Sequence, residues 1–347
     1  LQNATWVFEA KIVAENAAAF SRFGYSICLE DSILVVGSPH YGDLGQTSKG
    51  PHSGAAYIFE LSSSGDWNQA QQLIPDDLSK GYNFGHSVDC AQNYIAIGAF
   101  NSAGNSTHNA GAVYIYTKAN GTWILDGEEV TSPDGKNGDR FGYSISLNLS
   151  DKLYLLVGAY QHNHLKGAAY LYEKNISSTS FSKEIPIQKI KPNTLSRTKS
   201  EQYTVNKVEE KRLQIKGSQE SNDWVQIHKF QPSELNNGDI FGYSVSIDED
   251  NLVIGSPMAH GIAEQSGAAY YYRQEADATW SLKDKLINLS GKKHDQYGIH
   301  VEIASSNIFI GSTHHDGHEV DHGKIYSYRY INNEKHEKNH ISSLHQR

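Results

Sequence analysis

The stretch that decides the fold runs from Phe241 to Trp280 and reads FGYSVSIDEDNLVIGSPMAHGIAEQSGAAYYYRQEADATW. Three short apolar runs are bounded by Gly, Pro and acidic turn residues, and a fourth run opens at Trp280. Residues 243, 245 and 247 alternate with polar neighbours, which is the two-residue period of a strand. The stretch therefore predicts four consecutive antiparallel strands.

The same unit recurs along the chain. Its opening aromatic-glycine pair stands at Phe23-Gly24, Phe84-Gly85, Phe141-Gly142, Phe241-Gly242 and Tyr297-Gly298. The third run opens at Gly54, Gly111, Gly167, Gly267 and Gly323. A tryptophan precedes each opening aromatic residue by 17 or 18 positions, at Trp6, Trp67, Trp123, Trp224 and Trp280. A fixed offset across such different intervening residues indicates repeated supersecondary units.

The repeated pattern is Phe-Gly, then Gly-Ser-Pro or Gly-Ala, then Gly-Ala-Ala-Tyr or Gly-Ala-Val-Tyr. It resembles the FG-GAP repeat of integrin-alpha-type β-propellers over roughly residues 6–330. The resemblance implies an all-β fold, a β-propeller of four-stranded antiparallel blades, and it is specific for fold but weak for function. We expect a single propeller domain over residues 1–331 and a polar tail over residues 332–347.

The number of blades depends on the long interval between Phe141 and Phe241. Residues 189–193 and 229–233 are similar fourth-strand endings, and each is followed nine residues after its proline by a first-strand-like sequence. We therefore interpret residues 201–233 as a degenerate repeat without its third strand and favour six blades. The alternative is five blades with a long insertion. In the favoured interpretation the repeats start near residues 23, 84, 141, 201, 241 and 297.

The two ends of the repeat array are complementary. Residues 6–16 form a fourth-strand sequence ahead of the first Phe-Gly pair, whereas residues 297–330 supply three strands. We expect the N-terminal strand to complete the last blade, which would pair an otherwise open sheet edge.

Charge and cysteine content exclude some functions. The net charge is −9, charged residues make up 20%, and no basic patch appears, which argues against nucleic acid or an anionic membrane as partner. No apolar run has the length of a membrane span. Cys28 lies five residues after Phe23 and Cys90 six after Phe84, so we expect their side chains to point to opposite strand faces. We therefore predict two buried thiols rather than a disulfide.

Several features favour a secreted or cell-surface protein. The chain starts at Leu1 and its single methionine is Met258, as expected of a processed mature chain or of a chain trimmed at its N-terminus. Six sequons are candidates for N-glycosylation: Asn3, Asn105, Asn120, Asn148, Asn175 and Asn288.

The candidate binding residues lie between the second and third strands of the repeats, in loops that a propeller brings to one face. They are His40, Tyr41, His108, His162, His164, His260, His314, His315, His318 and His322.

The run 313–322 could hold a divalent transition metal, but it has no known ligand spacing, so we favour a solvated polar loop. The connections between first and second strands are too short for the Asp-rich calcium loops of integrin-type repeats. We expect no metal and no cofactor.

No motif points to catalysis: there is no Gly-x-Ser-x-Gly elbow and no phosphate loop. We expect a non-enzymatic binding or adhesion module that recognises a partner protein, or joins an extracellular assembly, through its loop-bearing face. The alternative is a lectin-like module that reads glycans with residues such as Tyr41, His162 and Asn163. A hydrolase or lyase that uses the centre of the propeller is less favoured.

Overall fold

The computed structural model describes residues 7–45, 47–103, 109–176, 223–313 and 323–330, together with one strand at 341–343. These residues form five four-stranded antiparallel sheets. The first holds β1 (Ser26–Glu30), β2 (Ile33–Ser38), β3 (Ala55–Leu61) and β4 (Trp67–Leu73). The second holds β5 (Ser87–Ala91), β6 (Tyr94–Ala99), β7 (Ala112–Ala119) and β8 (Thr122–Leu125).

The third sheet holds β9 (Ser144–Leu149), β10 (Leu153–Ala159), β11 (Ala168–Lys174) and β12 (Val225–Phe230), with the single turn α1 (His162–Leu165) before β11. The fourth holds β13 (Val245–Asp248), β14 (Asn251–Ser256), β15 (Ala268–Gln274) and β16 (Trp280–Leu286). The fifth holds β17 (His300–Ala304), β18 (Asn307–Ser312), β19 (Lys324–Tyr330) and β20 (Ile341–Ser343). In every sheet each strand pairs with the next along the chain, so each repeat folds as an up-and-down meander.

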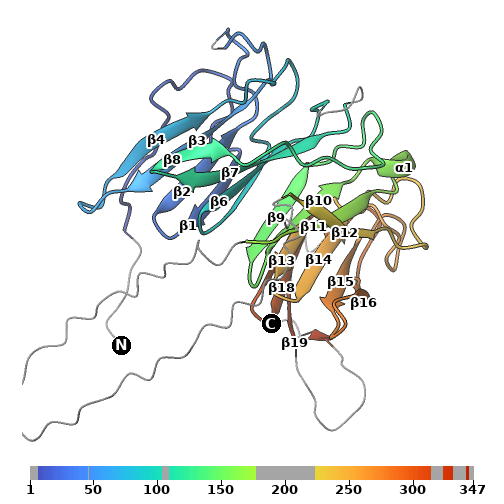
Figure 1. Cartoon of the computed structure of the whole chain (residues 1–347). Helices are drawn as coiled ribbons and strands as arrows, with labels where there is room; N and C mark the ends of the chain where they lie inside the picture. The colour runs from blue at the N-terminus through green and yellow to red at the C-terminus, as the bar shows by residue number, and fades with distance from the viewer. Residues whose placement is uncertain are drawn as a thin grey trace, which may run out of the picture.

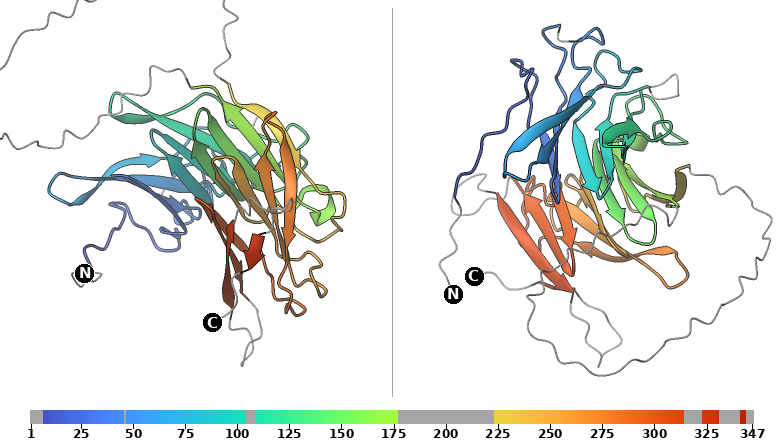
Figure 2. Two further views of the ribbon diagram at one scale, coloured as in Figure 1. Left: turned by 90° about the horizontal axis from the view of Figure 1, so that it is seen from below. Right: turned by 60° about the vertical axis from the view of Figure 1, so that its left-hand side comes forward.

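The sheets follow one another side by side in chain order, as the colour sequence in Figures 1 and 2 shows. The first strand of each sheet contacts the first strand of the next: β1 lies against β5, β5 against β9, β9 against β13, and β13 against β17. Single bridges link the sheets further, as between Gly54 and Phe84 and between Gly167 and Phe241. This arrangement of stacked meanders is that of propeller blades.

The repeated aromatic residues fill the space between blades. Phe84, Phe141, Phe241 and Tyr297 are fully buried. Each meets the tyrosine of its own blade's third strand edge to face; for example, the ring centroids of Phe84 and Tyr114 are 5.3 Å apart. The apolar area buried at these positions explains why the aromatic residue recurs in every repeat.

Glycine is required at the end of the second strand because the next blade comes too close for a side chain. A Cβ on Gly98 would lie 2.1 Å from the carbonyl oxygen of Gly142, and one on Gly37 would lie 2.1 Å from that of Gly85. The neighbouring serine uses the same carbonyl, since Ser87 Oγ donates to Gly142 O at 2.8 Å.

The interpretation of residues 201–233 as a separate blade is wrong for the part that the structure describes. Val225–Phe230 is β12, and it pairs with β11 as the fourth strand of the third sheet. Residues 201–222, and the similar sequence at 189–193, lie outside the described residues. Two similar fourth-strand sequences follow β11, and the one farther along the chain, in β12, pairs with β11. The described part of the chain thus contains five sheets.

The N-terminal segment does not complete the last blade. The strand beside β19 is β20, which lies within the segment expected to be a polar tail. Residues 7–16 form no strand and run beside the first sheet instead: the Glu15 backbone N–H donates to Gln69 Oε1 at 3.0 Å, and Ala14 is buried among Val36 and Tyr57. Trp6 lies outside the described residues.

The prediction of two free thiols is also wrong, because Cys28 and Cys90 form a disulfide between β1 and β5. Their side chains do point to opposite faces of equivalent strands. Blades stack face to face, however, so one face of β1 meets the opposite face of β5. The opposite orientation therefore brings the two sulfurs together, across a Cα–Cα distance of 6.0 Å.

Candidate binding face

The connections that precede β3, β7, β11 and β15, together with those that enter each sheet, including the first, form what we call the loop face. Backbone hydrogen bonds join the two kinds of connection. His40 N–H donates to Ser21 O at 3.2 Å, Asn83 N–H to His52 O at 2.9 Å, and Gly138 N–H to Asn109 O at 2.9 Å. The loop face is therefore a framework held by main-chain contacts rather than a set of independent loops.

The predicted binding residues differ widely in accessibility. His164 and His260 are exposed, His40 is half-buried, and Tyr41 and His162 are buried. His108, His314, His315, His318 and His322 lie outside the described residues.

His162 is buried and belongs to a polar network that extends to the half-buried Lys229 and the exposed Asp134. Its Nδ1 lies 2.7 Å from Asp139 Oδ2 and its Nε2 lies 2.9 Å from Lys229 Nζ. Lys229 also donates to Asp134 at 2.6 Å, and Tyr170 OH donates to the same carboxylate at 2.8 Å. Burial opposes ionisation of Asp134, but these hydrogen bonds prevail and lower its pKa to about 2. The network fixes the turn α1 to β12, and so His162 has a structural role.

A second cluster joins His40, Asp43 and His52 in the connection between β2 and β3. Asp43 Oδ2 lies 3.3 Å from His52 Nε2 and 4.0 Å from His40 Nδ1, and the two imidazole ring centroids are 4.0 Å apart. Burial, with the nearby His52 and Arg22, lowers the pKa of His40, while Asp43 acts in the opposite direction.

An arc of aromatic side chains crosses the first strands of neighbouring blades, and the sequence prediction did not include it. Tyr25 OH lies 3.2 Å from His86 Nε2, and His86 stacks on Tyr143 with ring centroids 4.5 Å apart. Tyr143 OH donates to Tyr243 OH at 3.0 Å, and Tyr160 packs against both of these tyrosines. A sequence feature could have predicted this arc, because four of the five residues that directly follow the aromatic-glycine pairs are Tyr or His.

Burial lowers the pKa of His86 to about 4, although its hydrogen bond to the Tyr143 carbonyl favours the protonated ring. At neutral pH the His86 ring is therefore uncharged. The arc offers the faces and edges of partly exposed rings, which suit apolar or stacking ligands.

Large exposed apolar side chains stand at intervals on the loop face. Phe20 is 74% exposed, Leu44 62%, Leu165 42%, Ile262 55% and Leu289 76%. They come from the connections around four of the five blades. Sequence reasoning missed them because single apolar residues in polar loops have no periodicity.

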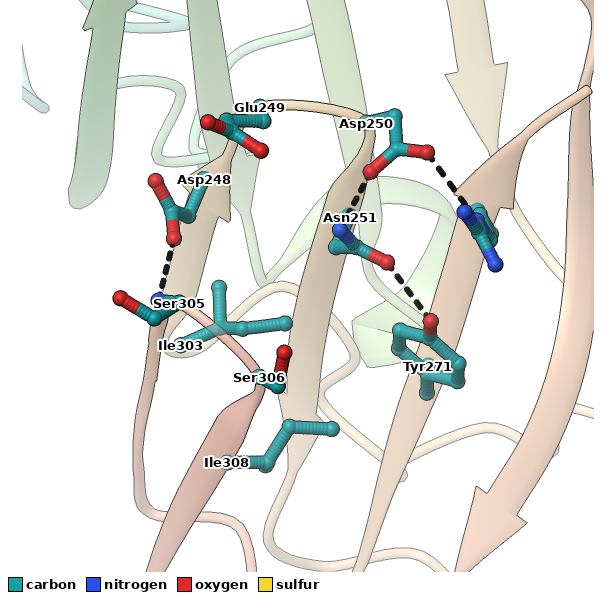
Figure 3. A pocket seen from close by; sticks show the side chains of 10 residues that line it. Asp248, Glu249, Asp250, Asn251, Tyr271, Ile303, Ser305, Ser306 and Ile308 are labelled. Carbon is teal, nitrogen blue, oxygen red and sulfur yellow. Dashed lines mark hydrogen bonds and ion pairs between the residues drawn. The ribbon is translucent and has the colours of Figure 1, made fainter. Parts of the chain in front are cut away.

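The opposite face, at the hairpin turns, holds an acidic hollow of about 400 Å³ between the fourth and fifth blades (Figure 3). Two of its three carboxylates have partners within the hollow. Asp248 accepts from the Ser305 backbone N–H at 2.5 Å, and Asp250 accepts from Arg273 Nε at 3.0 Å. Tyr271 OH donates to Asn251 at 2.7 Å. These contacts fix the two turns to each other and to β15.

The sequons also differ in accessibility. Asn120 and Asn175 are exposed at the ends of β7 and β11, and Asn148 is half-buried in β9. Asn288 is buried, and its side-chain amide donates to Tyr326 OH at 2.9 Å. Asn3 and Asn105 lie outside the described residues.

Comparison with known families agrees with the repeat structure. The family model described as FG-GAP repeat matches four times, at residues 6–59, 67–116, 126–172 and 224–272, together more than half of the chain. The fourth match begins beside β12, where the chain re-enters the described structure. A search of curated proteins gives no match. Within the described residues, no helix is long and apolar enough to cross a membrane.

Proposed function

Because the chain belongs to the FG-GAP repeat family, whose repeats occur in adhesion-type and integrin-like proteins, we propose that it is a non-enzymatic extracellular binding module. Its partner is a protein, recognised through the loop face. Family membership supports the proposed class of protein, and the exposed side chains of the loop face support the proposed mode of recognition.

The observation that carries the proposal is the set of exposed apolar side chains on the loop face. Leu44, Ile262 and Leu289 are each more than half exposed, in connections that also contain polar residues. Apolar contacts within a polar surround are typical of protein interfaces, where a few large side chains supply most of the binding free energy. The main-chain bonds between the loops reduce the entropy lost on binding.

Two observations support an extracellular location. The disulfide between Cys28 and Cys90 is of the kind that forms and persists in oxidising compartments. The sequons at Asn120 and Asn175 lie at exposed chain positions where a glycan can be attached.

The test is to isolate the partner with the full chain and then measure its affinity for two variants. We expect the double variant Leu44→Asp/Ile262→Asp to bind at least tenfold more weakly, because charged groups would enter an apolar contact. The control is Ile124→Asp on β8, where an isoleucine that is 48% exposed lies near the opposite face. The proposal would be contradicted if the double variant and the control variant lost affinity equally, or if neither variant lost affinity for the partner.

The aromatic arc favours a second candidate function, glycan binding. Tyr25 is 47% exposed, and its ring presents an apolar face of the kind on which sugar rings stack. Saccharide-selective binding on a glycan array, lost in Tyr25→Ala and kept in Leu44→Asp/Ile262→Asp, would favour this function over protein recognition.

A further inference from the structure

We propose that His40, Asp43 and His52 bind a divalent transition-metal ion of the zinc type. The site lies in the loop between β2 and β3 of the first blade. It goes beyond the proposed function and does not depend on it. No metal was predicted from the sequence, because only the run 313–322 and the short connections between first and second strands were considered.

The three donor atoms are already close to the positions that an ion requires. One donor atom from each residue lies within 4.8 Å of the other two, and Asp43 Oδ2 lies 3.3 Å from His52 Nε2. Tetrahedral coordination with zinc–ligand bonds of about 2.0–2.1 Å places ligand atoms about 3.3 Å apart. The His40 nitrogen, 4.0 Å from the same oxygen, reaches its position by a small rotation of the ring.

The loop holds the carboxylate in the required orientation. Asp43 Oδ1 accepts a hydrogen bond from the His52 backbone N–H at 2.8 Å, which leaves Oδ2 directed toward the two imidazoles. His52 itself has a left-handed backbone, with φ at 54°, a conformation uncommon for histidine. Gly54 N–H donates to Tyr41 O at 3.1 Å and closes the loop behind the cluster. A ligand oriented by a second hydrogen bond is a common feature of metal sites.

The donor set selects the class of metal. Two imidazoles and one carboxylate suit Zn²⁺, Co²⁺ or Ni²⁺, whereas Ca²⁺ and Mg²⁺ prefer oxygen ligands alone. Three protein ligands leave a further coordination position for water. Arg22 is the nearby cation that opposes binding, and Asp43 is the anion that favours it.

The test uses the full chain in which His314, His315, His318 and His322 are all replaced by glutamine, so that the histidines of that segment do not contribute. Zn²⁺ is titrated by isothermal calorimetry, and Co²⁺ binding is followed by its visible absorption. We expect one site, with affinity at least tenfold lower in His52→Gln and in His40→Gln. The control His260→Gln, which removes an exposed histidine of the loop face, should bind like its parent.

Thermal unfolding in EDTA establishes that each variant is folded. Zinc binding of equal affinity and stoichiometry in His40→Gln and His52→Gln would overturn the proposal. Preference for Ca²⁺ over Zn²⁺ in competition would also overturn it. Because partner binding can be measured in EDTA, failure of this site and failure of the proposed function are distinguishable.

Discussion

At the scale of single residues, the fold depends on close backbone contacts between blades. Gly37, Gly98, Gly158 and Gly255 are equivalent positions, and a Cβ on any of them would lie within about 2.1 Å of a carbonyl oxygen in the next blade. The equivalent Gly311 of the last blade has no neighbour closer than 3.5 Å. The recurrence of glycine thus has a steric cause at four of the five positions.

We predict that Gly98→Ala destabilises the protein strongly, by about 3 kcal/mol or more, since the clash is with backbone and can be relieved only by separating the blades. Gly311→Ala should change stability by less than about 0.5 kcal/mol. Urea unfolding measures both. If Gly311→Ala destabilised the protein as much as Gly98→Ala, the prediction would be wrong, because Gly311 would then have a close backbone neighbour as Gly98 does.

His86 makes stability depend on pH. Its folded-state pKa of about 4 lies below the usual 6.5, so the unfolded chain binds a proton more readily, and stability falls as the pH drops from about 6.5 toward 4. For this partly exposed ring we expect a loss of roughly 1 kcal/mol between pH 7 and 5 after allowance for screening. Urea unfolding of His86→Gln should show a shallower dependence over this interval; an unchanged slope would contradict the assignment.

At the scale of elements, the sequence predicts most strands, because each is a short apolar run between turn residues. It does not predict which fourth strand pairs with β11, because two similar sequences follow β11 and the choice is a long-range one. The disulfide was missed for a related reason. Because side chains alternate along a strand, the sequence predicts on which face of β1 Cys28 lies. It does not predict that this face packs against the face of β5 that carries Cys90, because that depends on how the blades stack. The sequence also did not predict the cluster of His40, Asp43 and His52, because these side chains meet only through the conformation of the loop between β2 and β3.

The disulfide joins β1 to β5 and so fixes the first blade to the second. Replacing both cysteines by serine should lower stability by about 3 to 4 kcal/mol, because the bond closes a segment with a sequence separation of 62 residues in the unfolded chain. Chemical denaturation with and without reductant measures this. Reductant should destabilise the native protein and leave the double variant unaffected; a wild type insensitive to full reduction would contradict the expectation.

At the scale of the whole molecule, the first and last of the five described sheets each carry large apolar side chains that the other described residues leave exposed. Ile27 and Leu29 on β1 are 66% and 61% exposed, whereas the equivalent Ile145 and Leu147 on β9 are 9% and 6% exposed. In the last sheet, Ile325 on β19 is 78% exposed. In the proposed function the two faces have different roles: the hairpin turns are held to one another, whereas the loops present exposed apolar side chains.

The most direct test of the loop face as the binding surface is cross-linking mass spectrometry of the full chain with its isolated partner. We predict that cross-links fall in the connections at residues 39–54, 100–111, 160–167 and 257–267. Cross-links concentrated instead at the hairpin turns of the opposite face, such as 62–66, 249–250 and 275–279, would contradict the account.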